Sequence, residues 1–241
     1  MKKLAPGIIV ALIFAAAFIA IQAFAYKPLA VSDNTVSIGE FTALHLEGPF
    51  DIYFTQGPVA DARIESDADY SDKIQFLKSD NTLVIKTKDD KNWNWRGRTC
   101  KIYLTTPALD EVEINGSGDF YSTNQINIGK TLDLSIAGSG DINAEVQTPK
   151  VKANIAGSGD MDLKGNAEKI ELSIAGTGDF SSAALIANEA KVDIAGTGDA
   201  TIFAHDLVDA SVSGTGDVLY LGNPQHVSAS VSGTGSVEPK K

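Results

Sequence analysis

Hydrophobic and polar residues alternate with a period of two on both sides of a short glycine motif that recurs through the second half of the chain. The motif is Gly-(Ser/Thr)-Gly-(Asp/Ser), and its seven copies begin at Gly116, Gly138, Gly157, Gly176, Gly196, Gly214 and Gly233. Apolar residues stand four and two positions before the first glycine of each copy and four positions after it, with a polar residue three positions before. This period is typical of strands with one buried face.

The alternation continues across the two glycines, so apolar residues stay on one side of the chain before and after them. A strand that bends at a corner keeps this parity, and glycine there lets the backbone turn sharply and approach the core. One strand-corner-strand unit cannot bury its own apolar face, but stacked units can. The sequence therefore predicts an all-β fold, a single-domain β-solenoid (β-helix) with coils of about 19 residues. A propeller blade needs about 40 residues, which excludes that alternative.

The period also predicts which side chains lie inside the solenoid. The expected buried stack consists of Ile155, Ile174 and Ile194. The expected outward neighbours of this stack are Ser135, Asn154 and Ser173. At a spacing of about 4.8 Å between coils, seven coils would form a rod segment of roughly 30 Å.

The first half of the chain is a degenerate version of the same pattern. Residues 44–52 alternate in the same sense and predict a degenerate first coil, and three further strand-like runs follow at Ile74–Leu77, Leu83–Thr87 and Lys101–Thr105. Ser182–Val192 has some helical character, but its place inside the repeat favours a strand. The seventh repeat has Ser236 in place of Asp and ends in Glu-Pro-Lys-Lys, so we expect it to cap the open edge.

The N-terminus has the features of an export signal. Lys2 and Lys3 precede an apolar run, and Ala23-Phe24-Ala25 supplies the small-x-small pattern of a cleavage site. We expect a signal peptide at residues 1–25, a linker at 26–37 and a solenoid domain at 38–238 with regular repeats at 110–236. The alternative is an uncleaved anchor, since the apolar stretch is long enough to span a bilayer. After cleavage no stable membrane insertion is expected, and the protein would reside in the periplasm or at the surface of a bacterium.

Composition narrows the function classes. The 241 residues have a formal charge of −11, which argues against nucleic acid as a partner because a phosphate binder needs a basic surface. A single cysteine excludes a disulfide scaffold and a multi-cysteine metal site. That cysteine, Cys100, is expected to be a buried, unreactive thiol. The histidines His45, His205 and His226 are scattered and do not have the spacing of metal ligands.

Three segments give the chain a more specific resemblance. They are Phe50-Asp51-Ile52-Tyr53-Phe54-Thr55-Gln56-Gly57, Leu83-Val84-Ile85-Lys86-Thr87, and Ile102 to Leu109 leading into Ile114-Asn115-Gly116-Ser117-Gly118-Asp119. Together with the repeat, which extends the match over residues 38–235, they resemble the bacterial head GIN domain family of "putative auto-transporter adhesin" proteins. The resemblance implies an exported, β-solenoid-like protein and an adhesion-type role.

The repeats place one Asp at each of six corners, and we name this set the Asp column. It consists of Asp119, Asp141, Asp160, Asp179, Asp199 and Asp217. Carboxylates about 5 Å apart repel each other by roughly 3 kcal/mol at an effective dielectric constant of about 20. In one interpretation each Asp accepts backbone N–H groups at its own corner. In the other, calcium binds between coils, as in solenoids with Gly-Gly-x-Gly-x-Asp repeats, although one glycine and one spacer are missing here.

The polar loop at residues 88–98 contains the best candidates for surface binding. They are Trp93, Trp95, Arg96 and Arg98, an aromatic and basic group that would stack on a glycan or a protein surface; the alternative is that the tryptophans cover the side of the rod. No nucleophile elbow is present, and no cofactor is expected apart from the calcium alternative. The sequence thus favours a non-enzymatic binding or adhesion module. A periplasmic envelope scaffold or stress-associated component and, less favoured, a polysaccharide-active β-helix enzyme stay open as alternatives.

Overall fold

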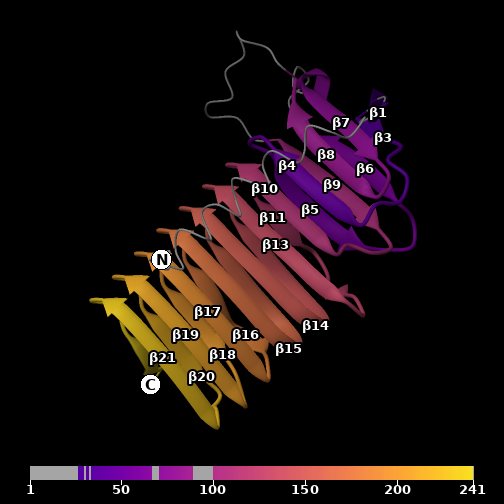
Figure 1. Cartoon of the computed structure of the whole chain (residues 1–241). Coiled ribbons are helices and arrows are strands. Elements are labelled where there is room, and N and C mark those ends of the chain that lie inside the picture. The colour runs from indigo at the N-terminus through magenta and orange to yellow at the C-terminus, as the bar shows by residue number, and fades with distance from the viewer. Residues whose placement is uncertain (1–26, 30, 33, 67–70, 89–99, 241) are drawn as a thin grey trace, which may run out of the picture.

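The structure, a computed structural model, describes residues 27–29, 31–32, 34–66, 71–88 and 100–240. The described chain is a β-solenoid of about seven stacked turns of about 19 residues, which confirms the predicted fold class (Figure 1). The one helical element in these residues is the 3-10 turn η2 (Ser71–Lys73). No helix in the described part of the chain is both long enough and apolar enough to cross a bilayer.

Each regular coil has two faces that meet at the glycine corner. The incoming face consists of the strands that run into the corner: β10 (Glu111–Gly116), β13 (Thr131–Gly138), the second halves of β14 (Ile142–Gly157) and β15 (Met161–Gly176), β17 (Glu189–Gly196), β19 (Leu207–Gly214) and β21 (His226–Gly233). The outgoing face consists of the strands that leave it: β11 (Phe120–Ser122), β12 (Ile126–Asn127), the first halves of β14 and β15, β16 (Phe180–Ile186), β18 (Ala200–Phe203), β20 (Val218–Leu221) and β22 (Val237–Pro239).

Neighbouring coils pair in parallel and in register, so equivalent side chains stack along the rod. Ile155 pairs with Ile174 and Ile174 with Ile194, and these side chains are at most 2% exposed. The adjacent polar residues Asn154 and Ser173 are only half-buried. The predicted buried stack is therefore confirmed, and so is the preference for strand over helix in residues 182–192, which lie in β16 and β17 except for Ala187 and Asn188 between them.

The glycine corners are explained by the packing of one coil on the next. A Cβ atom on Gly138 would lie 2.1 Å from the carbonyl oxygen of Gly116, and one on Gly140 would lie 2.0 Å from that of Gly118. Gly138 also has a φ of 148°, in the region that L side chains rarely adopt. The expectation that these glycines allow a close approach to the core is wrong in direction, because the closest obstacle to a side chain is the backbone of the preceding coil.

The N-terminal coils are stacked out of sequence order. β4 (Ala43–Glu47) pairs in parallel with both β8 (Thr82–Thr87) and β10, and β5 (Asp51–Gln56) pairs in parallel with both β9 (Lys101–Thr106) and β11. Residues 43–56 thus form the predicted degenerate coil, but the coil formed by β8 and β9 lies on its outer side. The predicted strands at 83–87 and 101–105 are these outer strands.

An antiparallel cap covers the N-terminal end of the stack. β6 (Asp61–Glu65) pairs with β9 and β7 (Ile74–Ser79) pairs with β8, and the short strands β1 (Lys27–Pro28), β2 (Val31–Ser32) and β3 (Thr35–Val36) add to them. Part of the segment expected as a linker, residues 26–37, is therefore docked on the cap, where Val36 is 1% exposed.

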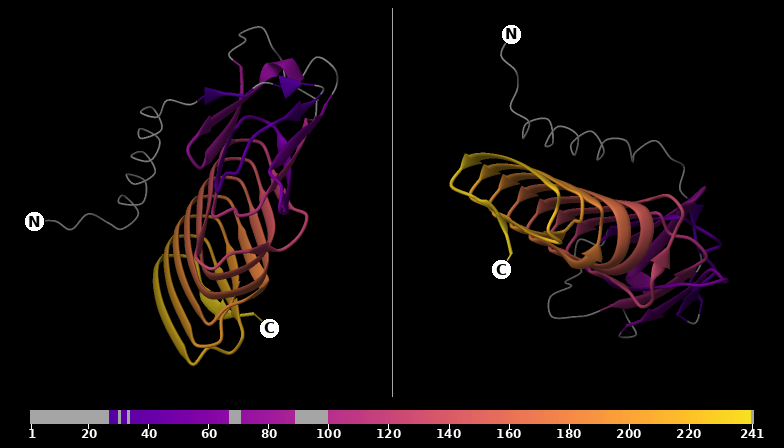
Figure 2. Two further views of the ribbon diagram at one scale, coloured as in Figure 1. Left: turned by 90° about the vertical axis from the view of Figure 1, so that its right-hand side faces the viewer. Right: turned by 90° about the horizontal axis from the view of Figure 1, so that it is seen from below.

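The C-terminal end is open, contrary to the expectation of a closing cap (Figure 1). β21 pairs with β19 on one side, and all eight of its residues are exposed. The two ends of the rod therefore differ: antiparallel strands cover the first, and the second presents an unpaired parallel edge (Figure 2).

Candidate functional site

The Asp column runs along the corner of the solenoid, and a further aspartate, Asp51, stands at the equivalent position before it, although the Asp119 N–H donates to the Phe50 carbonyl and not to Asp51. Ile52 pairs with Phe120, and the Ile52 N–H donates to the carbonyl of Asp119, as the Phe120 N–H donates to that of Asp141. Asp51 therefore occupies the position of Asp119 in the preceding coil. Asp51 stands three residues after Gly48, the same spacing as in the repeats, so the sequence contains a signal for this position. Lys101 on β9 is the strand neighbour of Asp51, so it occupies the equivalent position one coil nearer the N-terminal cap.

Each carboxylate of the Asp column accepts a hydrogen bond from the next coil. The backbone N–H of Asp160 donates to Asp141 Oδ1 over 2.8 Å, and that of Asp179 donates to Asp160 Oδ1 over 2.8 Å. The remaining bonds of this ladder, at 2.7 to 3.0 Å, have as donors Asp141, Asp199, Asp217 and Ser236. The expectation of bonds within one corner is thus corrected: the carboxylates tie neighbouring coils together.

This ladder accounts for one oxygen of each carboxylate. A carboxylate has two oxygens, so acceptor capacity remains along the edge. At the start of the column, burial and the negative charge of Asp119 raise the pKa of Asp51 above its usual range, although Lys101 opposes the rise. The corner is therefore a strip of regularly spaced acceptors held on a rigid backbone.

Beside the Asp column, the outgoing face changes from large to small side chains. Tyr103, Tyr53 and Tyr121 stack at 5.3 Å between successive ring centroids. Asn143 follows Tyr121 at the equivalent position, and Asp162 follows Asn143. This step in size opens a hollow of about 260 Å³, lined by Tyr121, Ser122, Asn143, Ala144, Glu145, Asp162 and Lys164.

A second hollow of about 450 Å³ extends from Asp162 along the column to Leu219. Its lining includes Asp160, Asp179, Asp199, Asp217, Ser181 and Thr201. We name the two hollows together the trough; five coil spacings separate Tyr121 from Leu219, which gives it a length of roughly 24 Å. At its head Tyr121 donates its hydroxyl to Asp119 Oδ2 over 3.0 Å, and burial and this bond raise the pKa of Tyr121, which therefore stays neutral.

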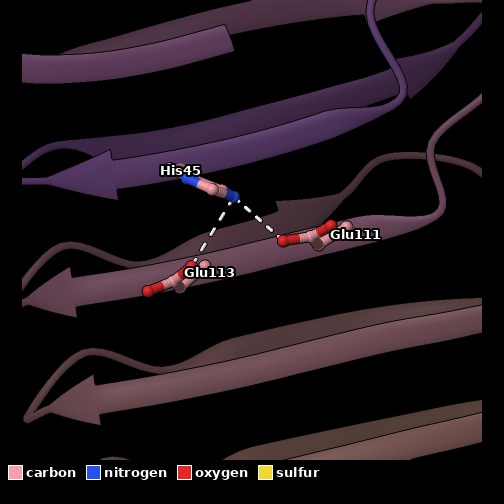
Figure 3. Close-up of side chains that lie close together, drawn as sticks. All are labelled: His45, Glu111 and Glu113. Carbon is pink, nitrogen blue, oxygen red and sulfur yellow. Dashed lines mark hydrogen bonds and ion pairs between the residues drawn. The ribbon is translucent and has the colours of Figure 1, made fainter. Parts of the chain in front are cut away.

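A separate cluster of titratable groups lies on the incoming face near the N-terminal end (Figure 3). His45 on β4 lies between two carboxylates of β10: its Nε2 is 2.9 Å from Glu111 Oε1 and 3.5 Å from Glu113 Oε2. Parallel pairing of β4 with β10 brings His45 opposite Glu113, so the three side chains lie close enough to hold a metal ion together, although their spacing in the sequence does not resemble that of metal ligands. No local spacing signals a contact across 66 residues of sequence.

The electrostatics of this cluster favour a charged histidine over a metal centre. Burial lowers the pKa of His45, but the hydrogen bond to Glu111 and the charges of Glu113, Glu111 and Glu47 outweigh it, so the pKa is raised above 6.5. The same hydrogen bond lowers the pKa of Glu111 below 4.5. His45 Nδ1 has no hydrogen-bond partner among the described residues, whereas a metal-bound histidine usually donates its second N–H to an acceptor. The three side chains could ligate a divalent cation, but it would have to displace a proton.

The structure places some of the other candidate residues from the sequence. Cys100 is 1% exposed, and burial together with the charge of Asp51 raises the pKa of its thiol to about 12, which confirms the expected buried state. His205 packs edge-on against Phe203, and His226 is exposed on β21. The loop candidates Trp93, Trp95, Arg96 and Arg98, like residues 1–25, lie outside the described residues.

Comparison with known proteins agrees with this architecture. A family described as "Putative auto-transporter adhesin, head GIN domain" matches residues 40–224, most of the chain. The chain belongs to this family. The matched residues contain the degenerate coil, the regular coils as far as β20 and the corner that positions the Asp column. Among functionally curated proteins, none matches the chain.

Several solved structures share this fold. The chain is similar to a putative adhesin from Bacteroides fragilis NCTC 9343, with 27% identity, a TM-score of 0.79 and coverage of 91% of this chain and 98% of that one. Two others from Parabacteroides share the fold. They are a putative lipid binding protein from P. distasonis (23% identity, TM-score 0.66, 86% and 95% coverage) and a putative adhesin from P. merdae (22%, 0.65, 91% and 97%). The family and the B. fragilis relative support a role in adhesion or binding.

Proposed function

We propose that the chain is an exported, non-enzymatic binding module of the adhesion type, and that its trough holds an extended glycan. The observation that supports this most directly is the trough itself. It is shallow, about as long as several sugar residues, and bordered on one side by the Asp column. The carboxylate oxygens that the ladder leaves over can accept hydrogen bonds from sugar hydroxyl or amino groups.

Charge narrows the class of ligand. Five aspartates line the second hollow: Asp160, Asp162, Asp179, Asp199 and Asp217. One cation, Lys164, is present in the lining, and it is paired with Glu145 over 3.2 Å. A polyanion would be repelled by this surface. We therefore expect neutral or amino-bearing glycans and not acidic ones.

The chemistry of the lining supports binding rather than catalysis. Among the described residues that line the trough, the polar groups are carboxylates, hydroxyls, one amide and the Lys164 amine, with neither histidine nor cysteine. The carboxylates of the Asp column form a uniform row, in which each accepts a hydrogen bond from a backbone N–H of the next coil. Their environments therefore do not differ from one another as those of the acid and the base do in glycosidases. A rigid, repetitive surface fits a module that presents one face to a polymer.

Binding can be tested by filling the trough. The immobilised protein should retain neutral or amino-bearing polysaccharides, and Asn143→Trp, an exposed position in the lining, should abolish retention. Ser213→Trp is the matched control, because Ser213 is exposed on the incoming face. Equal retention by Asn143→Trp and the native protein, or retention of acidic polysaccharides alone, would contradict the proposal.

Export is tested separately. The N-terminal Lys2-Lys3, the apolar run and Ala23-Phe24-Ala25 support cleavage after Ala25 and release to the periplasm or the cell surface. Fractionation of the native cell followed by N-terminal sequencing should find a chain that begins at Tyr26 outside the cytoplasm. A full-length chain in the inner membrane would instead favour the anchored alternative, and with it a role as an envelope scaffold.

A further inference from the structure

Among the described residues, the last coil of the rod has a neighbouring coil on one side only. In the sixth coil, Val208, Ala210 and Val212 of β19 are at most 1% exposed, because β21 covers them. In the seventh coil, Val227 is 44% exposed and Val231 42%. β21 also pairs on one side only, so about half of its backbone N–H and C=O groups point away from the stack. An exposed, unpaired strand edge of eight residues is a template for pairing with another strand.

The sequence of β21 is complementary to itself. Residues 227–231 read Val-Ser-Ala-Ser-Val in both directions. If two copies of this strand pair antiparallel about Ala229, Val227 lies opposite Val231 of the second copy, and each serine lies opposite a serine. This register keeps the valines and alanines on the core side in both copies, whereas a slip by one residue would turn them outward.

Charge also favours a second copy at this end. The whole chain has a formal charge of −11, but residues 218–241 contain one Glu and two Lys, a net charge of +1. The Asp column ends at Asp217, and Ser236 takes its place in the last coil. Two strongly acidic rods can therefore meet at this end without bringing their rows of carboxylates together.

The rest of the molecule limits how copies can join. The N-terminal end is covered by β6 and β7, so it offers no matching parallel edge for head-to-tail growth. On the other strand of the last coil, Pro239 lacks an N–H, so β22 is a poorer template than β21. An interface between identical β21 strands is two-fold symmetric and closes on itself as a dimer.

We propose that two copies of the chain join tail to tail through antiparallel pairing of β21 about Ala229, which continues the sheet and the apolar core from one rod into the other.

Oligomeric state is the first test. In analytical ultracentrifugation the native protein should sediment as a dimer, and a variant with both Val227→Lys and Val231→Lys should sediment as a monomer. Both valines are already exposed at the end, so the variant should keep its fold, which circular dichroism checks. Val59→Lys is the matched control, since Val59 is 68% exposed and lies outside the last coil; it should stay dimeric. A monomeric native protein, or a dimer that survives the double lysine variant, would overturn the proposal.

Cross-linking tests the register. Opposed residues in an antiparallel pair have Cα atoms roughly 4.5 to 5.5 Å apart, which suits a disulfide. Ala229→Cys should therefore form a covalent dimer under a mild oxidant, while Cys100 is buried and should not react. Val227→Cys alone should cross-link poorly, but its mixture with Val231→Cys should give a covalent heterodimer. Equally rapid cross-linking by Val227→Cys alone would refute the register, because it would indicate collision or a different pairing.

Discussion

Replacing Gly159 by alanine tests how closely the coils pack. A Cβ atom at this position would lie 2.0 Å from the carbonyl oxygen of Gly140, and contacts under 3.0 Å are essentially never seen for real Cβ atoms. The obstacle is backbone, which cannot rotate away, so the two coils must separate locally by about 1 Å. The expected result is a large loss of stability from the addition of a single methyl group.

The magnitude follows from the hydrogen bonds beside Gly159. The Ser158 N–H donates to the Gly138 carbonyl over 2.9 Å, and the Asp160 N–H donates to Asp141 Oδ1 over 2.8 Å. A separation of about 1 Å would stretch both beyond hydrogen-bonding distance. At about 1 kcal/mol for a neutral bond and up to about 3 for one to a charged group, the loss is roughly 2 to 4 kcal/mol.

Urea unfolding followed by circular dichroism measures this loss. The matched control is Gly129→Ala, because nothing lies within 4 Å of a Cβ at Gly129; its stability should be unchanged or up to about 1 kcal/mol higher. If Gly159→Ala unfolds within about 0.5 kcal/mol of the native protein, the coils are not stacked as closely as the structure indicates, and the steric explanation of the motif fails.

Four further predictions follow from the core, the Asp column and the buried titratable groups. Ile174→Asp should prevent folding because it buries a charge between Ile155 and Ile194, whereas Ile174→Val should lose only about 1 kcal/mol; similar melting temperatures for the two would contradict the buried stack. Asp179→Asn keeps an acceptor for the Asp199 N–H and should change stability by less than about 1 kcal/mol, and millimolar calcium should shift melting only slightly. A calcium-dependent rise that is lost when Asp160 and Asp179 are both replaced would establish the cation alternative. Because folding raises the pKa of His45 above 6.5, protonated His45 stabilises the fold fully below pH 6.5, and this stabilisation is lost as the pH rises through the pKa of the folded state. The melting temperature should therefore fall more steeply above pH 6.5 in the native protein than in His45→Gln. Parallel plots of melting temperature against pH for the two proteins would argue against the cluster. The Cys100 thiol, with a pKa of about 12, should react with a thiol reagent only on unfolding, and rapid labelling of the folded protein would refute its burial.

The repeat by itself determined most of the regular part of the fold. Apolar residues alternate with a period of two, and the alternation keeps its parity across each Gly-x-Gly. Only stacked coils in register then bury Ile155, Ile174 and Ile194 together. Side-chain parity is a local property of a strand, so it can be read from neighbouring residues. For the same reason the positions of the Asp column along the corner were predictable before its hydrogen bonds were known.

The tertiary structure alone decided what depends on contacts between distant segments. It placed residues 43–56 between the coil of β8 and β9 and the coil of β10, and so brought His45 to Glu111. It also decided that the carboxylates bond to the next coil, and that the apolar edge at the C-terminal end stays open. A period of two specifies which side of a strand is buried but not which strand lies beside it, because backbone hydrogen bonds between strands are the same for every sequence.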